Sequence, residues 1–464
     1  MGRWLRTALV SALLAWGFTA AAAAQAPSDA QRAQAREIYQ RIIAFDTSVE
    51  GGQNPAMANY LAGLFRAAGF AEEDVHVLPL NNTAGLLVRY RGDGSGGRPI
   101  LLLAHMDVVP ALRSDWERDP FTLVEENGFF FGRGTIDNKA GVAHLTSTFL
   151  TLRAEGFTPT RDLIIWFSGD EETSGATTQA LLADHRALLG EAEFALNSDA
   201  GGGQLDSQNR GVAYVVQTAE KTYASFTFTA RNPGGHSSQP RPDNAIYELG
   251  DALSRLRAFQ FPVMWNESFR NAANIFPGPE SAALRRFAER PGDRVAARTL
   301  ANNVSLSSMM RTTCVATMLS GGHAENALPQ TASATVNCRI FPGVAVDDVL
   351  GELRAIAGSN IEVTQLGPSN SSDASPLRPD VMQATARAVH TNYPNAVMSP
   401  YMSAGATDGL FFRAAGIPTY GVGAIFIGDN DDFAHGLNER VPVDSFYNGL
   451  THWRVLLTEL AGPQ

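Results

Sequence analysis

Apolar strand-like runs that alternate with helix-like segments constrain the fold of this chain more than any other feature of its sequence. The strand-like runs lie at residues 86–90, 99–109, 162–169 and 193–199, and the helix-like segments at 141–156 and 178–190. This alternation predicts an α/β fold with a mostly parallel sheet that helices cover on both faces. Ligands of such sheets bind beyond the carboxyl ends of the strands. Polar residues that directly follow the strands are therefore the first candidates for a functional site.

Two amphipathic helices are expected between Ala30 and Phe70, and a different pattern begins near Lys221. Polar and apolar side chains then alternate with a period of two at residues 223–232, 314–319 and 332–340. Residues 243–259 between these runs have helical periodicity. Half-buried strands combined with helices predict a smaller α+β domain with an antiparallel sheet.

We expect the smaller domain at residues 220–366. The α/β pattern resumes after it, so the catalytic domain would consist of residues 27–219 and 367–464. Within the smaller domain, residues 259–302 are rich in Arg, Pro and Asn and form an insertion to which the sequence assigns no purpose.

Residues 1–26 have the order of a secretory signal peptide. Arg3 and Arg6 precede an apolar run from Ala8 to Ala20, and small residues follow. The alternative is an uncleaved membrane anchor, but the apolar run is shorter than the roughly 20 residues that a helix needs to span a bilayer. We therefore expect a cleaved signal and a mature protein that is periplasmic or secreted and is not bound to a membrane.

The charge and the motif content exclude several classes of protein. The chain has 36 Lys and Arg against 47 Asp and Glu, a net charge of −11, whereas nucleic-acid-binding domains have a surplus of positive charge. Its 2 cysteines exclude a four-cysteine zinc site. Neither GxSxG nor HExxH is present, which argues against serine-hydrolase and zincin chemistry.

Cys314 and Cys338 lie in two alternating strand-like runs. If these runs pair as a hairpin centred on Asn326, the two cysteines are direct partners, because each lies twelve residues from the centre. An oxidising compartment would permit a disulfide between them. Two buried free thiols are the alternative, and the sequence does not decide between them.

His105 and Asp107 close the strand-like run 99–109, where residues two apart point to the same face. A metal-binding histidine normally has its second ring nitrogen held by an acceptor, a role open to Asp107. The alternative is a hydrogen-bonded pair that only caps the strand.

Asp137 lies in the glycine-punctuated turn GRGTIDNKAG, where it would be a ligand or would only cap the following helix.

Asp170, Glu171 and Glu172 follow the most apolar strand-like run of the chain. Three consecutive acids repel one another unless a cation or a helix dipole compensates their charge. A helix that begins at Thr173 would account for them. A metal site would instead make one acid a ligand and its neighbour the general base that acts on water.

Asp199, His236 and His435 are weak candidates when each is considered alone, because Asp in a glycine turn and His near a loop are common. Taken together, the candidate residues are stronger evidence for a metal site than any one of them alone. They include two histidines and three carboxylates, which suffice to hold two cations about 3.5–4 Å apart with one bridging acid.

In this order, the segments HMDVVP, GRGTIDNKAG, GDEETSG, NSDAGGG, GGHSSQP, ENALP and AHGLNE resemble the motifs of a di-zinc, co-catalytic metallopeptidase family. The family is that of glutamate carboxypeptidase, aminoacylase, acetylornithine deacetylase and succinyl-diaminopimelate desuccinylase, and the resemblance is closest to its carboxypeptidase S-like branch. It spans about residues 35–460. It implies a zinc-peptidase catalytic domain, an inserted lid and dimerisation domain, and two Zn²⁺ per subunit, with another divalent metal as an alternative.

The resemblance also implies a role for each candidate. The ligands of one zinc would be His105, Asp137 and Asp199, and those of the other Asp137, Glu172 and His435. Asp107 would orient His105. Glu171 would be the general base that takes a proton from the attacking water and passes it to the leaving amine.

His236 would stabilise the oxyanion of the tetrahedral intermediate. In the family, this histidine comes from the smaller domain of the partner subunit, so the resemblance implies a homodimer. The substrate carboxylate would bind Arg339, Asn326 and the loop that contains Gly405 and Thr407. Arg suits this role because its planar fork pairs with a carboxylate, and an ordinary charge at a strand edge is the alternative for Arg339.

The expected function is hydrolysis of the amide bond of small peptides by a zinc-dependent dipeptidase or carboxypeptidase. The alternatives are an N-acyl-amino-acid amidohydrolase and, from another class, a non-catalytic exported peptide-binding protein. Carboxypeptidase and deacylase members commonly have Glu where this chain has Asp199, which weakens the deacylase alternative. The presence of Glu171 together with all five ligand positions argues against a non-catalytic protein.

Overall fold

Two amphipathic helices, α1 (Asp29–Ile43) and α2 (Asn54–Ala67), open the described chain, which confirms the prediction for residues 30–70. The computed structural model describes residues 26–270, 278–290 and 292–463. The predicted signal peptide, apart from residue 26, lies outside the described residues. Helix α1 begins with a capping box between Ser28 and Gln31, which satisfies backbone N–H groups that a helix start leaves unpaired.

The large sheet has ten strands in the order β1-β2-β6-β3-β7-β17-β9-β8-β18, with β16 also paired to β9. Its strands are β1 (Val75–Leu80), β2 (Thr83–Tyr90), β3 (Ile100–His105), β6 (Leu163–Ser168), β7 (Phe194–Asn197), β8 (Gly202–Leu205), β9 (Gly211–Glu220), β16 (Val397–Ser403), β17 (Thr419–Gly421) and β18 (Phe426–Gly428). The central strands β6, β3, β7 and β17 run parallel, while the β1–β2, β2–β6, β17–β9 and β8–β9 pairs are antiparallel. The predicted α/β class is confirmed, with a sheet that is mixed towards its edges.

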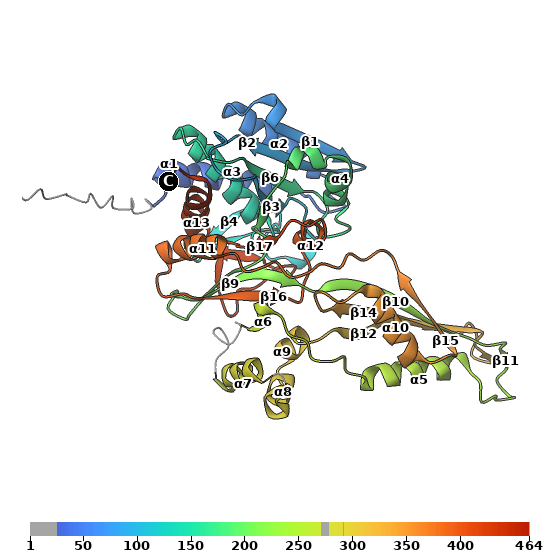
Figure 1. Ribbon diagram of the computed structural model, residues 1–464. Coiled ribbons are helices and arrows are strands. Elements are labelled where there is room, and N and C mark those ends of the chain that lie inside the picture. The colour runs from blue at the N-terminus through green and yellow to red at the C-terminus, as the bar shows by residue number, and fades with distance from the viewer. Residues whose placement is uncertain (1–25, 271–277, 291, 464) are drawn as a thin grey trace, which may run out of the picture.

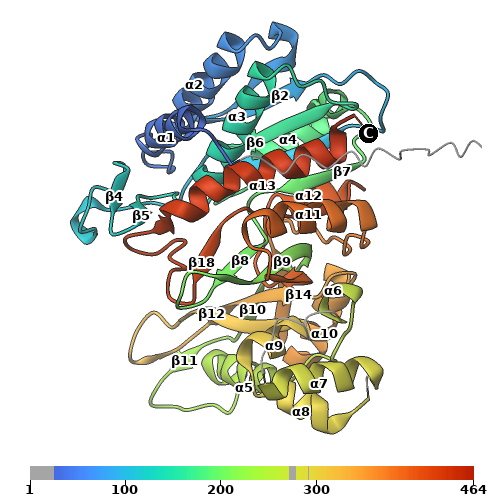
Figure 2. The same cartoon turned by 90° about the vertical axis from the view of Figure 1, so that its left-hand side faces the viewer.

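Helices cover both faces of this sheet (Figures 1 and 2). Along β3, Ile100 and Leu102 belong to the apolar cluster under α1, α2, α3 (Lys139–Ala154), α11 (Pro379–Asn392) and α13 (Val443–Ala461). Leu101 and Leu103 belong to the cluster on the opposite face, with α4 (Ala176–Asp184) and α12 (Gly409–Ala414). Burial on both faces explains why β3 is apolar from Ile100 to Ala104. The helix predicted at 178–190 is shorter, because a 3₁₀ turn, η3 (Arg186–Leu189), follows α4.

The small sheet is antiparallel, as predicted, in the order β12-β14-β10-β15. Its strands are β10 (Thr222–Arg231), β12 (Thr313–Gly321), β14 (Thr331–Ile340) and β15 (Ile361–Leu366), and helices α5 (Ala245–Ala258) and α10 (Val346–Ala357) cover one face. A short pair, β11 (Gly235–His236) with β13 (Ala327–Leu328), lies at the far tip of this part of the molecule (Figure 1). A further small sheet of β4 (Val124–Glu126), β5 (Phe129–Phe131) and β19 (Arg440–Pro442) was not predicted.

The segment predicted as an insertion at 259–302 forms short helices beside the small sheet. They are α6 (Glu267–Arg270), α7 (Gly278–Glu289) and α8 (Arg294–Ala301), and α9 (Val304–Met309) follows directly after the predicted segment. Their apolar side chains pack with Phe341 and Met402, so the segment has its own small core. No helix among the described residues is both long enough and apolar enough to cross a membrane.

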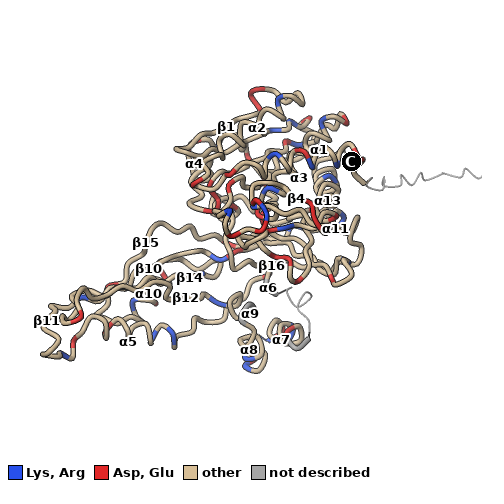
Figure 3. The backbone as a smooth tube through the Cα atoms, turned by 180° about the vertical axis from the view of Figure 1, so that it is seen from behind, with Lys and Arg blue, Asp and Glu red and all other residues tan. Residues whose placement is uncertain are grey.

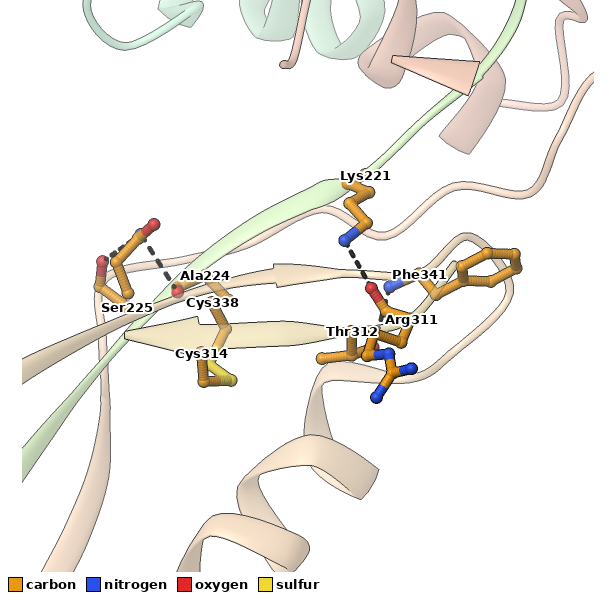
Figure 4. Close-up of a disulfide and its surroundings, with 9 residues drawn as sticks. Lys221, Ala224, Ser225, Arg311, Thr312, Cys314, Cys338 and Phe341 are labelled. Atoms are coloured by element: carbon orange, nitrogen blue, oxygen red, sulfur yellow. Dashed lines mark hydrogen bonds between the residues drawn. A yellow bond between two sulfur atoms is a disulfide. The ribbon is translucent and has the colours of Figure 1, made fainter. Parts of the chain in front are cut away.

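Cys314 and Cys338 form a disulfide (Figure 4). They are direct partners across β12 and β14, as the hairpin centred on Asn326 predicts. A bulge after Ala316 shifts the register by one residue, so Met318 faces Thr335. The alternative of two free thiols is therefore wrong.

The chain passes from the large sheet to the small sheet at Lys221, which lies between β9 and β10. The side chain of Lys221 is fully buried, and its Nζ donates to the backbone oxygen of Arg311 at 2.5 Å (Figure 4). Burial lowers the Lys221 pKa to about 7, and the positive charges of Arg339 and Arg311 act in the same direction.

Candidate metal centre

His105 is the last residue of β3 and is buried. Its Nδ1 lies 3.0 Å from the backbone oxygen of Asp107 and 3.4 Å from Oδ1 of the same residue. Its Nε2 lies 2.8 Å from Asp137 Oδ1 and 3.3 Å from Asp199 Oδ1. One ring nitrogen is thus held by acceptors while the other faces two carboxylates, which is the arrangement of an oriented metal ligand rather than of a simple strand cap.

His435 completes a second group beside the first. Its Nε2 lies 3.1 Å from Asp137 Oδ2 and 2.9 Å from Glu172 Oε2. The two oxygens of Asp137 therefore face different histidines. The structure brings together the same two sets of three residues that the sequence predicts, and in each set the ligand atoms lie within 4.8 Å of one another.

The chemistry of these side chains fits divalent zinc. Imidazole nitrogens and carboxylate oxygens are its ordinary ligands, and a shared carboxylate is suited to bridge two ions. The centre also concentrates negative charge. Hydrogen bonds that His435 donates to Asp137 and Glu172 raise the His435 pKa to about 10, and burial raises the Asp199 pKa to about 7. A bound cation would compensate this charge.

The three consecutive acids after β6 have three different roles. Asp170 caps α4, because its carboxylate accepts from Ser174 Oγ and from the N–H groups of Ala176 and Thr177. The helix begins at Ala176, so the predicted start at Thr173 is wrong. Glu172 belongs to the second ligand group, and Glu171 faces the cleft described below.

Asp107 connects the ends of two strands. Its Oδ1 accepts from the Glu171 N–H at 3.1 Å and its Oδ2 from the Glu172 N–H at 3.0 Å. Asp107 therefore fixes the backbone at Glu171 and Glu172. Burial, and then the charge of Asp199, raise the Glu171 pKa well above its ordinary value, which moves this carboxyl group towards the pKa range that suits a general base at neutral pH.

Asp137 does not cap a helix. Helix α3 begins at Lys139 with Asn138 at the cap position, and the Asp137 carboxylate is directed at the two histidines instead. The backbone of Asp137 is fixed by Glu439, a fully buried carboxylate that accepts from the Asp137 N–H at 3.1 Å. Glu439 was missed at the level of sequence, where its only signal is its place in the AHGLNE segment.

A cleft opens in front of the centre. Its lining consists of Asp137, Glu171, Glu172, Asp199, Ala200, Gly201, Gln217, Tyr401, Ser403, Ala406, Thr407 and His435. Of the predicted substrate-binding residues, Thr407 lines the cleft. Gly405 lies in the same loop, where its N–H donates to Ser403 Oγ at 3.0 Å.

The structure does not bring His236, Asn326 or Arg339 to the metal centre of the same chain. His236 lies in β11 at the tip of the small-sheet part, far from β17 and α12 (Figure 1), and is exposed. Asn326 lies beside it, since its backbone oxygen accepts from the Ser237 N–H at 3.0 Å. Arg339 lies on β14, a strand flanked on both sides, with its guanidinium 4.8 Å from the centre of the Tyr223 ring. Arg339 therefore does not lie on an edge strand of the small sheet.

Acidic and basic positions are interspersed along the described chain (Figure 3). Peptidase family M20/M25/M40 matches residues 101–459. The match covers well over half of the chain, which therefore belongs to this family. The resemblance found in the sequence is confirmed, as is the predicted enzyme class, a metallohydrolase that acts on peptide or amide bonds.

The known relatives include both peptidases and a hydrolase of N-acyl amino acids. The chain is 30% identical over 372 residues to the N-fatty-acyl-amino acid synthase/hydrolase PM20D1 of Xenopus tropicalis, which covers 76% of this chain and 71% of that protein. It is 28% identical over 277 residues to carboxypeptidase S of Saccharomyces cerevisiae, which covers 56% and 48% of the two chains. A crystal structure of an M20 family metallo-carboxypeptidase from Sulfolobus solfataricus has a similar fold, with a TM-score of 0.70 and 18% identity over 92% of this chain and 99% of that chain.

Proposed function

We propose that this chain is a zinc-dependent exopeptidase, a dipeptidase or carboxypeptidase, that hydrolyses the amide bond of small peptides with two Zn²⁺ per subunit. The observation that carries the proposal is the division of Asp137 between the two histidine groups, with Glu171 in the same cleft. The ligands would be His105, Asp137, Glu172, Asp199 and His435. The groups that act on or around the reacting atoms would be Glu171, Asp107 and His236.

When bound, zinc would polarise the scissile carbonyl and lower the pKa of the attacking water. Glu171 would take the proton from that water and deliver it to the leaving amine. Its buried position favours the protonated form, so it can hold the proton between the two steps. Asp107 would keep Glu171 in place through the backbone N–H group, and His105 in place through its ring.

The substrate carboxylate would bind Arg339, Asn326 and the loop with Gly405 and Thr407. Arg339 has no carboxylate partner in any ion pair found among the described residues, and burial lowers its pKa. A carboxylate of the substrate would supply the missing negative charge. We propose that residues 220–366, which carry Arg339 and Asn326, act as a lid over the catalytic domain formed by residues 27–219 and 367–464.

We further propose that the active form is a homodimer. Strand β12 is an edge strand with exposed apolar side chains: Val315, Met318 and Leu319 are 58%, 69% and 71% exposed. Ile246 and Tyr247 of the neighbouring helix α5 are exposed as well. An exposed apolar edge is a typical surface for pairing with a second chain. A second copy would also account for His236, which lies far from the centre of its own chain.

Complementation tests the dimer. Chains with Glu171→Gln and chains with His236→Ala should each have little activity. Unfolded and refolded together, they should recover activity, because a mixed dimer has one site with both an intact Glu171 and an intact partner His236. A mixture that stays as inactive as either variant alone would contradict a histidine supplied in trans.

The alternative function, hydrolysis of N-acyl amino acids, is supported by the relatives named N-fatty-acyl-amino acid synthase/hydrolase. The cleft favours the peptidase, because its lining is mainly polar and Ala200 and Ala406 are its only aliphatic side chains among the described residues. A long acyl chain prefers an extended apolar wall.

One experiment distinguishes the exopeptidase from the N-acyl-amino-acid hydrolase. The zinc-loaded protein is incubated with a panel of dipeptides, C-terminally extended peptides, N-acetyl amino acids and N-fatty-acyl amino acids, and released amino acid is measured with and without chelator. Metal-dependent release from peptides at a higher kcat/KM supports the exopeptidase. Preference for the fatty-acyl compounds would support the alternative, and inactivity on the whole panel would contradict both.

We also propose export, as the signal-like segment 1–26 predicts. The Cys314–Cys338 disulfide supports this proposal, since disulfides persist in oxidising compartments. Expression of a reporter fused to residues 1–26 tests it, with Arg3 and Arg6 changed to Glu as the control.

A further inference from the structure

A buried ion pair that the metal centre does not use lies behind the cleft. Glu220 is the last residue of β9, and Arg413 belongs to α12. Arg413 Nη1 lies 2.9 Å from Glu220 Oε1, with the two side chains 2% and 0% exposed. Taking two charges out of water is costly, and replacing a buried ion pair by apolar residues is often neutral or stabilising. Stability alone therefore does not account for this pair, but the other groups that it binds do indicate a role.

The second oxygen of Glu220 binds the cleft loop. Thr407 Oγ1 donates to Glu220 Oε2 at 3.1 Å, and the Thr407 N–H hydrogen-bonds the same carboxylate. Gln217 lies between the two charges: its Nε2 donates to Glu220 Oε2 at 3.3 Å, and its Oε1 accepts from Arg413 Nη2 at 3.2 Å. Thr407 and Gln217 both line the cleft. The ion pair therefore hydrogen-bonds two residues that line the cleft, Thr407 and Gln217.

The Thr407 hydroxyl has no hydrogen-bonding capacity left. Its proton points to Glu220, and its oxygen accepts from Asn197 Nδ2 at 3.1 Å and from the Gly409 N–H at 3.0 Å. Asn197 Oδ1 in turn accepts from the Asp199 N–H at 3.0 Å. A continuous chain of hydrogen bonds thus runs from the ion pair through Thr407 to the backbone of a proposed metal ligand.

We propose that Glu220 and Arg413 are positioning residues for the cleft loop, defined as residues 403–409. They would fix the position of Thr407 and, through it, of the loop. Asn197, which hydrogen-bonds both Thr407 and the Asp199 N–H, would fix the position of Thr407 relative to Asp199. Because its hydroxyl proton is used by Glu220, Thr407 would orient the loop rather than donate to the substrate itself. This inference rests on the proposed function only for the identity of the substrate.

Glu220→Gln tests the proposal. An amide has one acceptor oxygen, so it cannot accept from both Arg413 and Thr407, and the loop should lose part of its anchor. We expect hydrogen–deuterium exchange in a peptide covering the cleft loop to become at least tenfold faster. We also expect KM to rise about tenfold, equivalent to about 1.4 kcal/mol, with kcat changed less than threefold.

Glu193→Gln is the matched control, because Glu193 is bound by Arg161 and Arg378 in the same domain but not at the cleft. It should leave KM and the exchange of the cleft loop unchanged. If Glu220→Gln does not fold, the double change Glu220→Leu with Arg413→Met removes both charges together and should give the same two effects.

Unchanged exchange of the cleft loop in a folded Glu220 variant would overturn the proposal. Faster exchange with an unchanged KM would also overturn it as a statement about substrate binding. The exchange measurement needs no substrate. If the wild-type protein were inactive on the whole panel, the proposed function would fail while the exchange still decided whether the ion pair positions the loop.

Discussion

Glu439→Gln tests whether one buried carboxylate orders the loop that holds Asp137. Glu439 Oε2 accepts from Arg133 Nη1 at 2.7 Å and from the Gly134 N–H at 2.9 Å. Its Oε1 accepts from the Ile136 N–H at 2.7 Å and from the Asp137 N–H at 3.1 Å. An amide has nearly the same shape, but one of its two ends is a donor. In either orientation it therefore loses two of the four hydrogen bonds.

The expected cost follows from these contacts. A hydrogen bond to a charged group contributes about 1.5–3 kcal/mol, so two of them amount to roughly 3–6 kcal/mol. Breaking a buried ion pair by removing one partner costs about 3–5 kcal/mol. Both figures describe the same contacts, so they are not added. We expect the free energy of unfolding to fall by about 3–5 kcal/mol and the zinc affinity to fall about 10- to 100-fold, because the backbone of Asp137, the proposed bridging ligand, loses its support.

Urea unfolding followed by circular dichroism, and zinc titration of the folded protein, measure the two effects. Glu193→Gln again serves as the control: its carboxylate also binds arginine, but it supports no ligand. It should cost about 1–2 kcal/mol and leave the zinc affinity unchanged. A Glu439→Gln variant that loses less than about 1 kcal/mol, or that binds zinc as the wild type does, would refute the reasoning.

Other parts of the molecule lead to predictions of the same kind. Glu171→Gln should lower kcat about 10²- to 10⁴-fold while metal analysis finds the zinc content unchanged, since Glu171 belongs to neither ligand group; an active variant with bound zinc would remove it from the base role. Replacing Cys314 and Cys338 together by Ala should lower the free energy of unfolding by about 3 kcal/mol, because the disulfide closes a loop with a sequence separation of 24; an unchanged urea midpoint would contradict this. Burial lowers the pKa of His144 to about 4 and that of His452 to about 3, from 6.5. Below pH 6.5 the unfolded chain binds protons that the folded chain does not. The free energy of unfolding therefore decreases as the pH is lowered, by about 2 kcal/mol per histidine between pH 7 and pH 5. Changing both histidines to Gln should remove that part of the pH dependence in urea unfolding, and an equally steep dependence would count against it.

The fold could be predicted where burial on both faces leaves a continuous apolar run. Leu101 and Leu102 pack into clusters on opposite faces, so every position of β3 before His105 is apolar, and the same holds for β6 before Ser168. The pairing of β16 with β9 and of β18 with β8 could not be predicted. These strands are short or remote from one another in the sequence, and no local pattern specifies which strands become neighbours.

The candidate ligands could be singled out from the sequence because they follow strands and belong to motifs, but the groups that support them could not. Asp170 and Glu172 are both acids in one run, and only the path of the chain makes one a cap and places the other beside His435. Glu439 and Arg413 are charged residues that the sequence cannot distinguish from surface charges. Their burial depends on partners that come from distant segments, as Arg133 does for Glu439 across 306 residues.

The parallel pairing of β3 and β6 is a condition for the centre itself. His105 and Ser168 are register partners, so the two strands end at the same level of the sheet. Asp107 lies just beyond the first strand and can therefore reach the N–H groups of Glu171 and Glu172 just beyond the second. If the two strands ran antiparallel, these ends would lie on opposite edges of the sheet. Asp107 could not then contact His105, Glu172 and Glu171 at once, so the proposed roles of these residues depend on the direction of the two strands as much as on the residues themselves.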